Sequence, residues 1–91
     1  MLEKTIEKYL VDECKKLGVL CDKFTSPQRR SVPDRVVSAS GGRVYFVELK
    51  AEGKKPTEAQ LRDHQRRRGL GQTVIVIDSK AQVDKFVEFL K

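Results

Sequence analysis

The chain has 91 residues, of which 38% are hydrophobic and 35% charged. This composition suits one small domain with a modest core and excludes two-domain, fibrous and disordered classes. Its 19 Lys and Arg outnumber its 13 Asp and Glu, giving a net charge of +6, so a polyanion is the natural partner. No stretch approaches the roughly 18 apolar residues of a transmembrane helix, and charges near the N-terminus interrupt any signal-peptide pattern. We therefore expect a cytoplasmic protein with one domain, residues 1–91, and no membrane association.

The first half of the chain predicts one helix and three strands. Apolar residues recur at steps of three and four before Gly18, which is typical of an amphipathic helix that ends at a glycine. Later segments are rich in β-branched and aromatic residues, and Gly41 and Gly42 between two of them indicate a hairpin. Cys14 and Cys21 have no further cysteines beside them, so we expect reduced thiols rather than a zinc site or a disulfide framework. The predicted helix covers residues 2–17, and the predicted strands cover residues 19–25, 35–39 and 43–51.

The second half predicts a helix, a strand and a last helix. A Thr-Gln capping box begins a helix over residues 58–68, and the continuous apolar run at 74–77 favours a strand covered on both faces. We expect that strand in the centre of the sheet. Ser79 and Gln82 form a second capping box before the last amphipathic helix. The predicted fold is α/β, a mixed β-sheet flanked by helices in the order α-β-β-β-α-β-α, because the helix after the hairpin returns the chain parallel to an earlier strand.

The strand over residues 43–51 carries the most informative pattern. Strand alternation places Glu48 and Lys50 on one face of an otherwise apolar segment. Burying either charge without a partner costs several kcal/mol, so the pair needs an explanation. One interpretation is an ion pair between Glu48 and Lys50 on a solvated face. The other is a metal ligand beside a catalytic cation.

Asp34 decides between these interpretations because it enters the neighbouring strand directly after the stiff Pro33. A two- or four-residue turn pairs positions that sum to 83, and this sets Asp34 opposite Leu49 on the wrong face. A three- or five-residue turn, or a bulge, makes the sum 82 or 84 and brings Asp34 onto the Glu48 face. A catalytic site therefore requires the odd register. The alternative is that Asp34 is an ordinary turn residue at the entrance of a strand.

Pro33-Asp34, followed after thirteen residues by Glu48-Leu49-Lys50, resembles the motif of the PD-(D/E)xK nuclease superfamily. More narrowly, most of the chain resembles the virus-type replication-repair nuclease family, VRR-NUC. The segments that carry this resemblance are Ser26-Pro27, Val32-Pro-Asp-Arg35, Phe46-Val-Glu-Leu-Lys-Ala51, Lys54-Lys-Pro56, Gln60 and Val74-Ile-Val-Ile-Asp-Ser79. The family usually has glycine before Val-Pro-Asp, whereas this chain has Ser31 there, and Gln28 stands where another glycine is common. The resemblance implies the restriction-endonuclease-like form of the α/β fold.

The resemblance also implies a DNA endonuclease that depends on Mg²⁺ or Mn²⁺, hard cations that prefer oxygen ligands. It implies that Asp34 and Glu48 bind the metal and that the backbone carbonyl of Leu49 supplies another oxygen. Lys50 resembles the lysine that positions the attacking water and stabilises charge on the scissile phosphate. Gln60 resembles a glutamine at the edge of the site, and its alternative role is that of a capping-box partner.

Family members place a glutamate of the first helix near the metal. Glu3 fits this role, with Glu7 as the alternate because it lies one turn away on the same helix face. A solvated helix carboxylate is the alternative for either residue. His64 lies between two polar residues, and we expect it on the surface.

The expected partner is DNA. The resemblance implies branched DNA such as a four-way junction, in bacterial or phage replication and repair, and two cuts in a symmetric junction favour a homodimer. Basic residues flanking the predicted site suit phosphate contacts, although a solvated charged face is the alternative. These residues are Arg29, Arg30, Arg35, Lys54, Lys55, Arg62, Arg66 and Arg67. Two rival functions are a non-catalytic nucleic-acid-binding module that needs no metal and an assembly domain that uses an exposed sheet edge.

Overall fold

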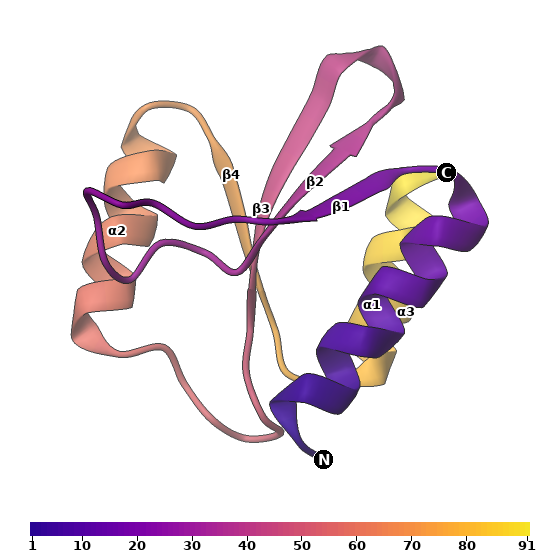
Figure 1. Cartoon of the computed structure of the whole chain (residues 1–91), viewed down its shortest axis with the longest axis horizontal. Coiled ribbons are helices and arrows are strands. Elements are labelled where there is room, and N and C mark those ends of the chain that lie inside the picture. Colours follow the sequence, from indigo (N-terminus) through magenta and orange to yellow (C-terminus); the bar gives the residue numbers. More distant parts are fainter.

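The computed structural model describes residues 1–91 and contains three helices and a four-stranded sheet (Figure 1). The helices are α1 (Glu3–Leu17), α2 (Glu58–Gly69) and α3 (Lys80–Leu90), and the strands are β1 (Leu20–Lys23), β2 (Arg35–Ala39), β3 (Arg43–Leu49) and β4 (Thr73–Ile77). This confirms the predicted α/β fold and its element order. None of the three helices has the length and apolar character of a membrane span.

The sheet has the strand order β1-β2-β3-β4 and is mixed, because β4 runs parallel to β3 while the other pairs are antiparallel. The strand β4 therefore lies at an edge, and the prediction of a central strand is wrong. Its apolar run reflects the cover on its two faces. Val74 is buried beside Phe46 on the α2 side, and Ile77 is buried in the core on the other side.

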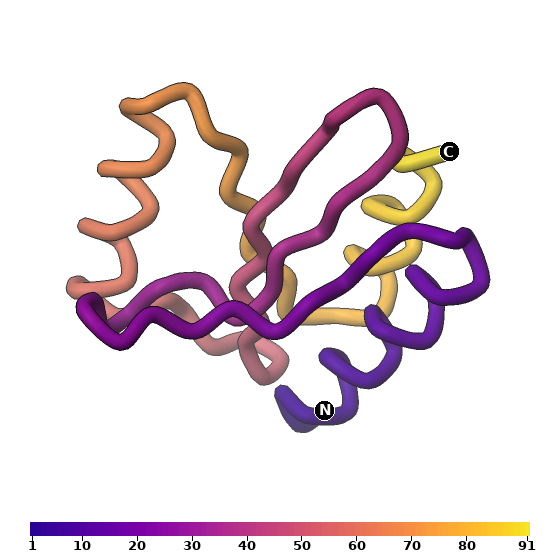
Figure 2. Tube along the Cα trace, turned by 45° about the horizontal axis from the view of Figure 1, so that its top comes forward, coloured from indigo at the N-terminus to yellow at the C-terminus, as the bar shows by residue number.

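Helices α1 and α3 cover one face of the sheet and α2 covers the other, as the two views show (Figures 1 and 2). The main core lies between the sheet and the α1–α3 pair. Its twelve buried residues are Ile6, Leu10, Cys14, Val37, Tyr45, Val47, Leu49, Ile77, Val83, Phe86, Val87 and Leu90. Both cysteines are free, as expected.

The helix ends follow the sequence signals with one exception. Gly18 ends α1 in the left-handed region with φ 80°, and the complete capping box of Thr57 and Gln60 begins α2. At α3 only half of the predicted box forms. The Ser79 hydroxyl accepts the Gln82 N–H, but the Gln82 amide oxygen accepts the N–H of Asp78 rather than that of Ser79.

The β2–β3 hairpin has the odd register. Paired positions sum to 82, as in Val37 opposite Tyr45, because the connecting turn is three residues long, Ser40–Gly42. Gly41 and Gly42 both have positive φ, near 75°, which only glycine adopts without strain. The paired region ends at Arg35 opposite Val47, and the preceding Asp34 also donates its N–H to the Val47 carbonyl. The register on which the catalytic interpretation depends is therefore confirmed.

Ser31 is the only non-glycine residue with positive φ, at 62°. This conformation costs an L-residue on the order of 1 kcal/mol. We predict that Ser31→Gly raises the free energy of unfolding by about 0.5–1 kcal/mol, the gain being limited by the greater freedom of glycine in the unfolded chain. Urea denaturation checks this, and Ser38→Gly in β2 is the control, because glycine weakens a regular strand. An equal loss of stability in both variants would contradict the assignment of strain to Ser31.

Candidate active site

Several of the predicted site residues meet where β3 leaves the sheet. The turn after β3 passes beside the N-terminus (Figure 1), and the Glu52 N–H donates to the Met1 carbonyl oxygen at 3.2 Å. The N–H of Lys50 donates to the Ile77 carbonyl at 2.9 Å, so strand pairing persists to the end of the motif. The first turn of α1 and the end of β3 therefore lie at the same end of the molecule.

Asp34 is held by hydrogen bonds on both sides of its backbone and through its side chain. Its N–H donates to the Val47 carbonyl at 3.0 Å, and its carbonyl accepts the Phe24 N–H at 2.9 Å. Its Oδ2 accepts the backbone N–H of Leu49 at 2.7 Å. Because N–H and C=O of one strand residue point to the same side, the Leu49 carbonyl also faces the Asp34 side of β3. Asp34 is thereby fixed next to the Glu48-Leu49-Lys50 motif.

Glu48 is buried, with 1% of its surface exposed. Burial raises the pKa of its carboxyl to about 8, and the nearby Asp34 charge acts in the same direction while Lys50 opposes it. The interpretation of Glu48 and Lys50 as an ion pair on a solvated face is therefore wrong. The structure instead places two carboxyl groups close together with an ammonium group nearby, an arrangement typical of functional sites.

Gln60 fills both roles that the sequence allowed. Its Oε1 accepts the Thr57 N–H at 2.9 Å, which completes the capping box of α2. Its Nε2 donates to Oε2 of Glu48 at 3.1 Å. The two ends of one amide thus join the start of α2 to the buried carboxyl group.

The two candidate glutamates of α1 lie in different surroundings. Glu7 pairs with Arg35, whose Nε lies 2.9 Å from Oε2, and both side chains are largely buried. Glu3 is exposed in the first turn, and its charge contributes to the raised pKa of Glu48. Glu7 is therefore held by an internal partner, whereas Glu3 is exposed at the end of α1 nearest the end of β3.

His64 is fully buried, so the expectation of a surface position is wrong. Its Nε2 lies 3.4 Å from Oε1 of Glu48. Burial lowers the pKa of the imidazole, and the Arg68 charge acts in the same direction. The one signal in the sequence that points to this position is its spacing of four residues from Gln60, which places both side chains on one helix face.

Two known proteins are similar to this chain, one in structure and one in sequence. A solved structure described as a VRR_NUC domain is 38% identical, covers 98% of this chain and 97% of its own, and superposes with a TM-score of 0.89. A relative from Acyrthosiphon pisum secondary endosymbiont phage 1, named "Putative nuclease p44", is 54% identical over 78 residues, which is 86% of this chain and 84% of the relative. The chain belongs to the VRR-NUC family. No family model matches the sequence.

Because the chain belongs to the VRR-NUC nuclease family, we ask whether the carboxyl groups of Asp34 and Glu48 suit a divalent cation. A cation between Asp34 and Glu48 would offset the repulsion that raises the pKa of Glu48. No group of three or more His, Cys, Asp or Glu side chains is arranged to hold a metal by itself. Mg²⁺ commonly takes only one or two carboxylates and completes its shell with water and substrate phosphate oxygens. The oxygen donors of this VRR-NUC chain therefore fit a hard cation that shares its shell with a substrate.

The structure separates the predicted DNA-binding residues into two groups. Arg35 and Arg67 are held by internal partners: Arg35 binds Glu7 and the Cys21 carbonyl, and Arg67 binds Asp63. These two side chains serve the fold, which charge counting does not reveal. The exposed residues, still available to a polyanion, are Arg29, Arg30, Lys54, Lys55, Arg62 and Arg66.

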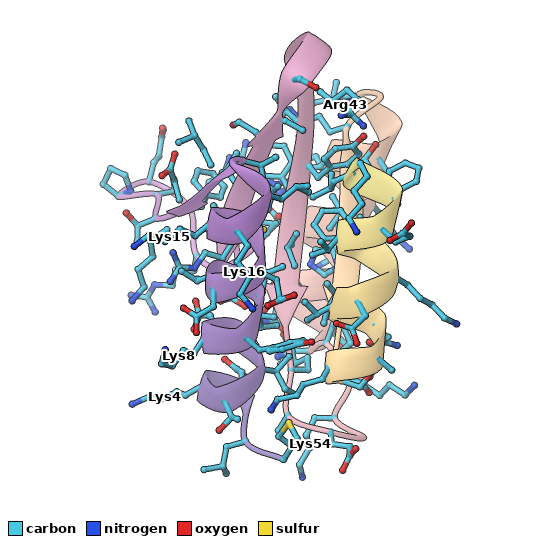
Figure 3. The ribbon with its side chains drawn as sticks, turned by 90° about the vertical axis from the view of Figure 1, so that its right-hand side faces the viewer. Lys4, Lys8, Lys15, Lys16, Arg43 and Lys54 are labelled. Atoms are coloured by element: carbon cyan, nitrogen blue, oxygen red, sulfur yellow. The ribbon has the colours of Figure 1, made fainter.

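A further row of basic side chains, outside the predicted DNA-binding set, lies along α1 (Figure 3). Lys8 and Lys16 are paired with Asp12 and Glu13 at 2.9 and 2.8 Å, which offsets part of their charge. Lys4 projects from the end of α1 that lies toward Lys54 (Figure 3). Lys4 therefore extends the exposed basic surface at the site end of the molecule.

Arg67 ties the loop after β1 to α2. Its guanidinium lies 5.1 and 5.0 Å from the ring centroids of Phe24 and Phe46 and 2.8 Å from Asp63. We predict that Arg67→Ala lowers the free energy of unfolding by about 1–2 kcal/mol, because it removes two cation–π contacts and leaves the buried Asp63 without its partner. Urea denaturation measures the loss. Arg66→Ala, the exposed neighbour, is the control and should stay within about 0.5 kcal/mol, so equal losses would contradict this role.

Proposed function

We propose that this VRR-NUC nuclease is a metal-dependent DNA endonuclease that cleaves branched DNA such as a four-way junction. One observation carries the proposal: Asp34 and Glu48 converge beside Lys50 at the end of β3, in the order of the PD-(D/E)xK motif. The nuclease name of the phage relative supports the reaction class. The net charge of +6 supports a nucleic-acid substrate.

In the proposed site Asp34 and Glu48 bind Mg²⁺ or Mn²⁺. The Leu49 carbonyl and the Glu3 carboxylate are the further oxygen donors. When bound, the cation supplies Lewis-acid stabilisation of the phosphate and makes hydroxide available near neutral pH. Metal binding requires ionised Glu48, so the cation and the proton that burial favours compete for the same carboxyl group.

Lys50 acts on the phosphate directly in this mechanism. Its ammonium group stabilises the negative charge that develops on the phosphoryl oxygens and orients the attacking water. Gln60 keeps one Glu48 oxygen in place through its Nε2. A half-buried ammonium is effective here because charges interact more strongly where water is partly excluded.

The exposed basic residues contact the DNA backbone on either side of the cut. A small chain with few surfaces for base edges recognises shape and phosphates rather than sequence. Binding therefore falls steeply with salt. Cleavage of both strands of a symmetric junction requires two sites, and we propose a homodimer on that ground.

The test is cleavage of a labelled four-way junction and of a matched linear duplex in Mg²⁺, Mn²⁺ or EDTA. We expect paired nicks in the junction with either metal and none in EDTA. Binding without cleavage in every metal would instead support a non-catalytic module. Equal cleavage of the linear duplex would refute the junction preference, and light scattering that finds a monomer on junction DNA would refute the homodimer.

A further inference from the structure

His64, the single histidine of the chain, lies directly against the proposed metal ligand. It is fully buried, and its Nε2 faces Oε1 of Glu48 at 3.4 Å. Its other ring nitrogen, Nδ1, is buried and has no hydrogen-bond partner. Such an arrangement requires an explanation, since buried polar atoms are rarely left unpaired.

The unpaired Nδ1 determines where the ring carries its proton. A proton on Nδ1 would be a buried donor without an acceptor, whether the ring were neutral or cationic. A proton on Nε2 instead points at the Glu48 carboxyl oxygen and leaves only a lone pair unsatisfied. The geometry therefore favours the neutral tautomer with its hydrogen on Nε2.

Gln60 and His64 together hold both oxygens of Glu48. The amide donates to Oε2 at 3.1 Å, and the imidazole faces Oε1 at 3.4 Å. The two residues lie four positions apart, on one face of α2. Two donors from one rigid helix restrict both the position and the rotation of the carboxylate plane.

We propose that His64 is a positioning residue, which through its Nε2–H fixes the Glu48 carboxylate in the orientation that binds the divalent cation. This role rests on the proposed metal-dependent function of the site. Partners behind a metal ligand orient it, and losing one typically lowers metal affinity 10- to 100-fold.

A role as simple core filler explains these observations less well. The buried residues of α2 are Asp63 and His64, so this helix presents polar side chains to the sheet. Burying an imidazole with one nitrogen unpaired costs free energy that a leucine of similar size would not. The contact with Glu48 accounts for a histidine at this position.

The first test measures the tautomer in the metal-free protein. A long-range ¹H–¹⁵N correlation spectrum distinguishes the protonated ring nitrogen from the bare one, and the single histidine makes the assignment unambiguous. We expect the hydrogen on Nε2. A hydrogen on Nδ1 would overturn the proposal, whether or not the chain cleaves DNA.

The second test measures Mn²⁺ affinity by titration calorimetry for the unaltered chain, His64→Gln and His64→Leu. Glutamine retains a donor near the position of Nε2, so we expect its affinity to stay within about threefold. Leucine fills the space without a donor, and we expect a loss of about tenfold or more. Equal affinities of the leucine variant and the unaltered chain would overturn the positioning role.

These outcomes separate this inference from the proposed function. If the unaltered chain binds no Mn²⁺, the metal-dependent function fails, and so does the role of His64 toward a cation. If it binds Mn²⁺ and both variants bind equally well, only the role of His64 fails. Circular dichroism establishes that each variant is folded. Should the leucine variant not fold, two results still overturn the proposal. One is a hydrogen on Nδ1 of His64, and the other is a more than threefold loss of Mn²⁺ affinity in the glutamine variant.

Discussion

Replacing Lys50 by alanine is expected to lower kcat for junction cleavage about 10²- to 10³-fold. In the proposed mechanism, the ammonium group stabilises charge that appears only as the phosphodiester bond breaks, so its loss affects the transition state more than the bound substrate. Lys50 is half-buried and is not an ion-pair partner of Glu48. The fold should therefore survive the change. Steady-state cleavage at saturating DNA concentration measures kcat, and fluorescence anisotropy in EDTA measures DNA affinity.

Lys54→Ala is the matched control for Lys50→Ala. Both remove one positive charge, but Lys54 is exposed in the turn after β3 (Figure 3). We expect this variant to weaken DNA binding and to leave kcat nearly unchanged. Asp34→Ala, which removes a proposed metal ligand, should lower kcat at least as much as Lys50→Ala does. Undiminished cleavage in both the Lys50 and Asp34 variants would show that the site assignment is wrong.

The hairpin shows how far sequence alone determines this site. Side-chain alternation along β3 and the stiff Pro33 left one point open, namely whether the β2–β3 turn has an odd or an even number of residues. An odd number puts Asp34 on the face of Glu48. The glycine pair indicated a turn but not its length, because two-, three- and four-residue turns all accept glycine. Only the structure shows that Ser40 joins Gly41 and Gly42 in the turn, which gives the odd register and puts Asp34 beside the Glu48-Leu49-Lys50 motif.

The position of His64 could not be predicted in the same way. Sequence patterns locate buried helix faces through apolar periodicity, and α2 buries Asp63 and His64 instead of apolar residues. One face of α2 is buried because the helix packs against the sheet, and no apolar stripe in its sequence indicates which face that is. For the same reason a charge count could not show that Arg67 lies against two aromatic rings whereas Arg66 remains exposed.

The apolar run of β4 led to the opposite error. Continuous apolar strands are typical of the centre of parallel sheets, because helices cover both of their faces. In this chain the helices α2 and α3 cover both faces of an edge strand. Hydrophobicity reports cover on the faces of a strand and not the number of strands paired with it.

Glu48→Gln is expected to stabilise the metal-free protein at pH 8 and above by about 2–4 kcal/mol while abolishing metal-dependent cleavage. The amide keeps the shape of the side chain but removes a carboxyl group whose ionised form is unfavourable in this buried position. Urea denaturation in EDTA across about pH 4 to 9 measures the difference. Stability and function are thus opposed at this residue.

The sign of the pH dependence follows from the raised pKa. An unfolded glutamate titrates near 4.5, whereas burial raises the pKa of Glu48 to about 8 in the folded protein. Between these values the folded state binds the extra proton, so the free energy of unfolding falls as pH rises, by at most about 1.4 kcal/mol per pH unit. The stability of the unaltered chain relative to Glu48→Gln should decline from about pH 5 and level off above about pH 8.

A divalent cation should restore the stability that the folded protein loses when Glu48 ionises. Bound Mg²⁺ requires the ionised carboxylate and stabilises the folded state, by about 2.7 kcal/mol when its concentration is a hundred times the dissociation constant. At pH 8 we therefore expect Mg²⁺ to raise the unfolding free energy of the unaltered chain and to leave that of Glu48→Gln unchanged. Parallel pH profiles of the two proteins in EDTA would contradict the raised pKa. An equal response of both to Mg²⁺ would place the metal elsewhere. The buried charge of Glu48 thus lowers the stability of the metal-free protein, and the same charge is what the proposed nuclease reaction requires.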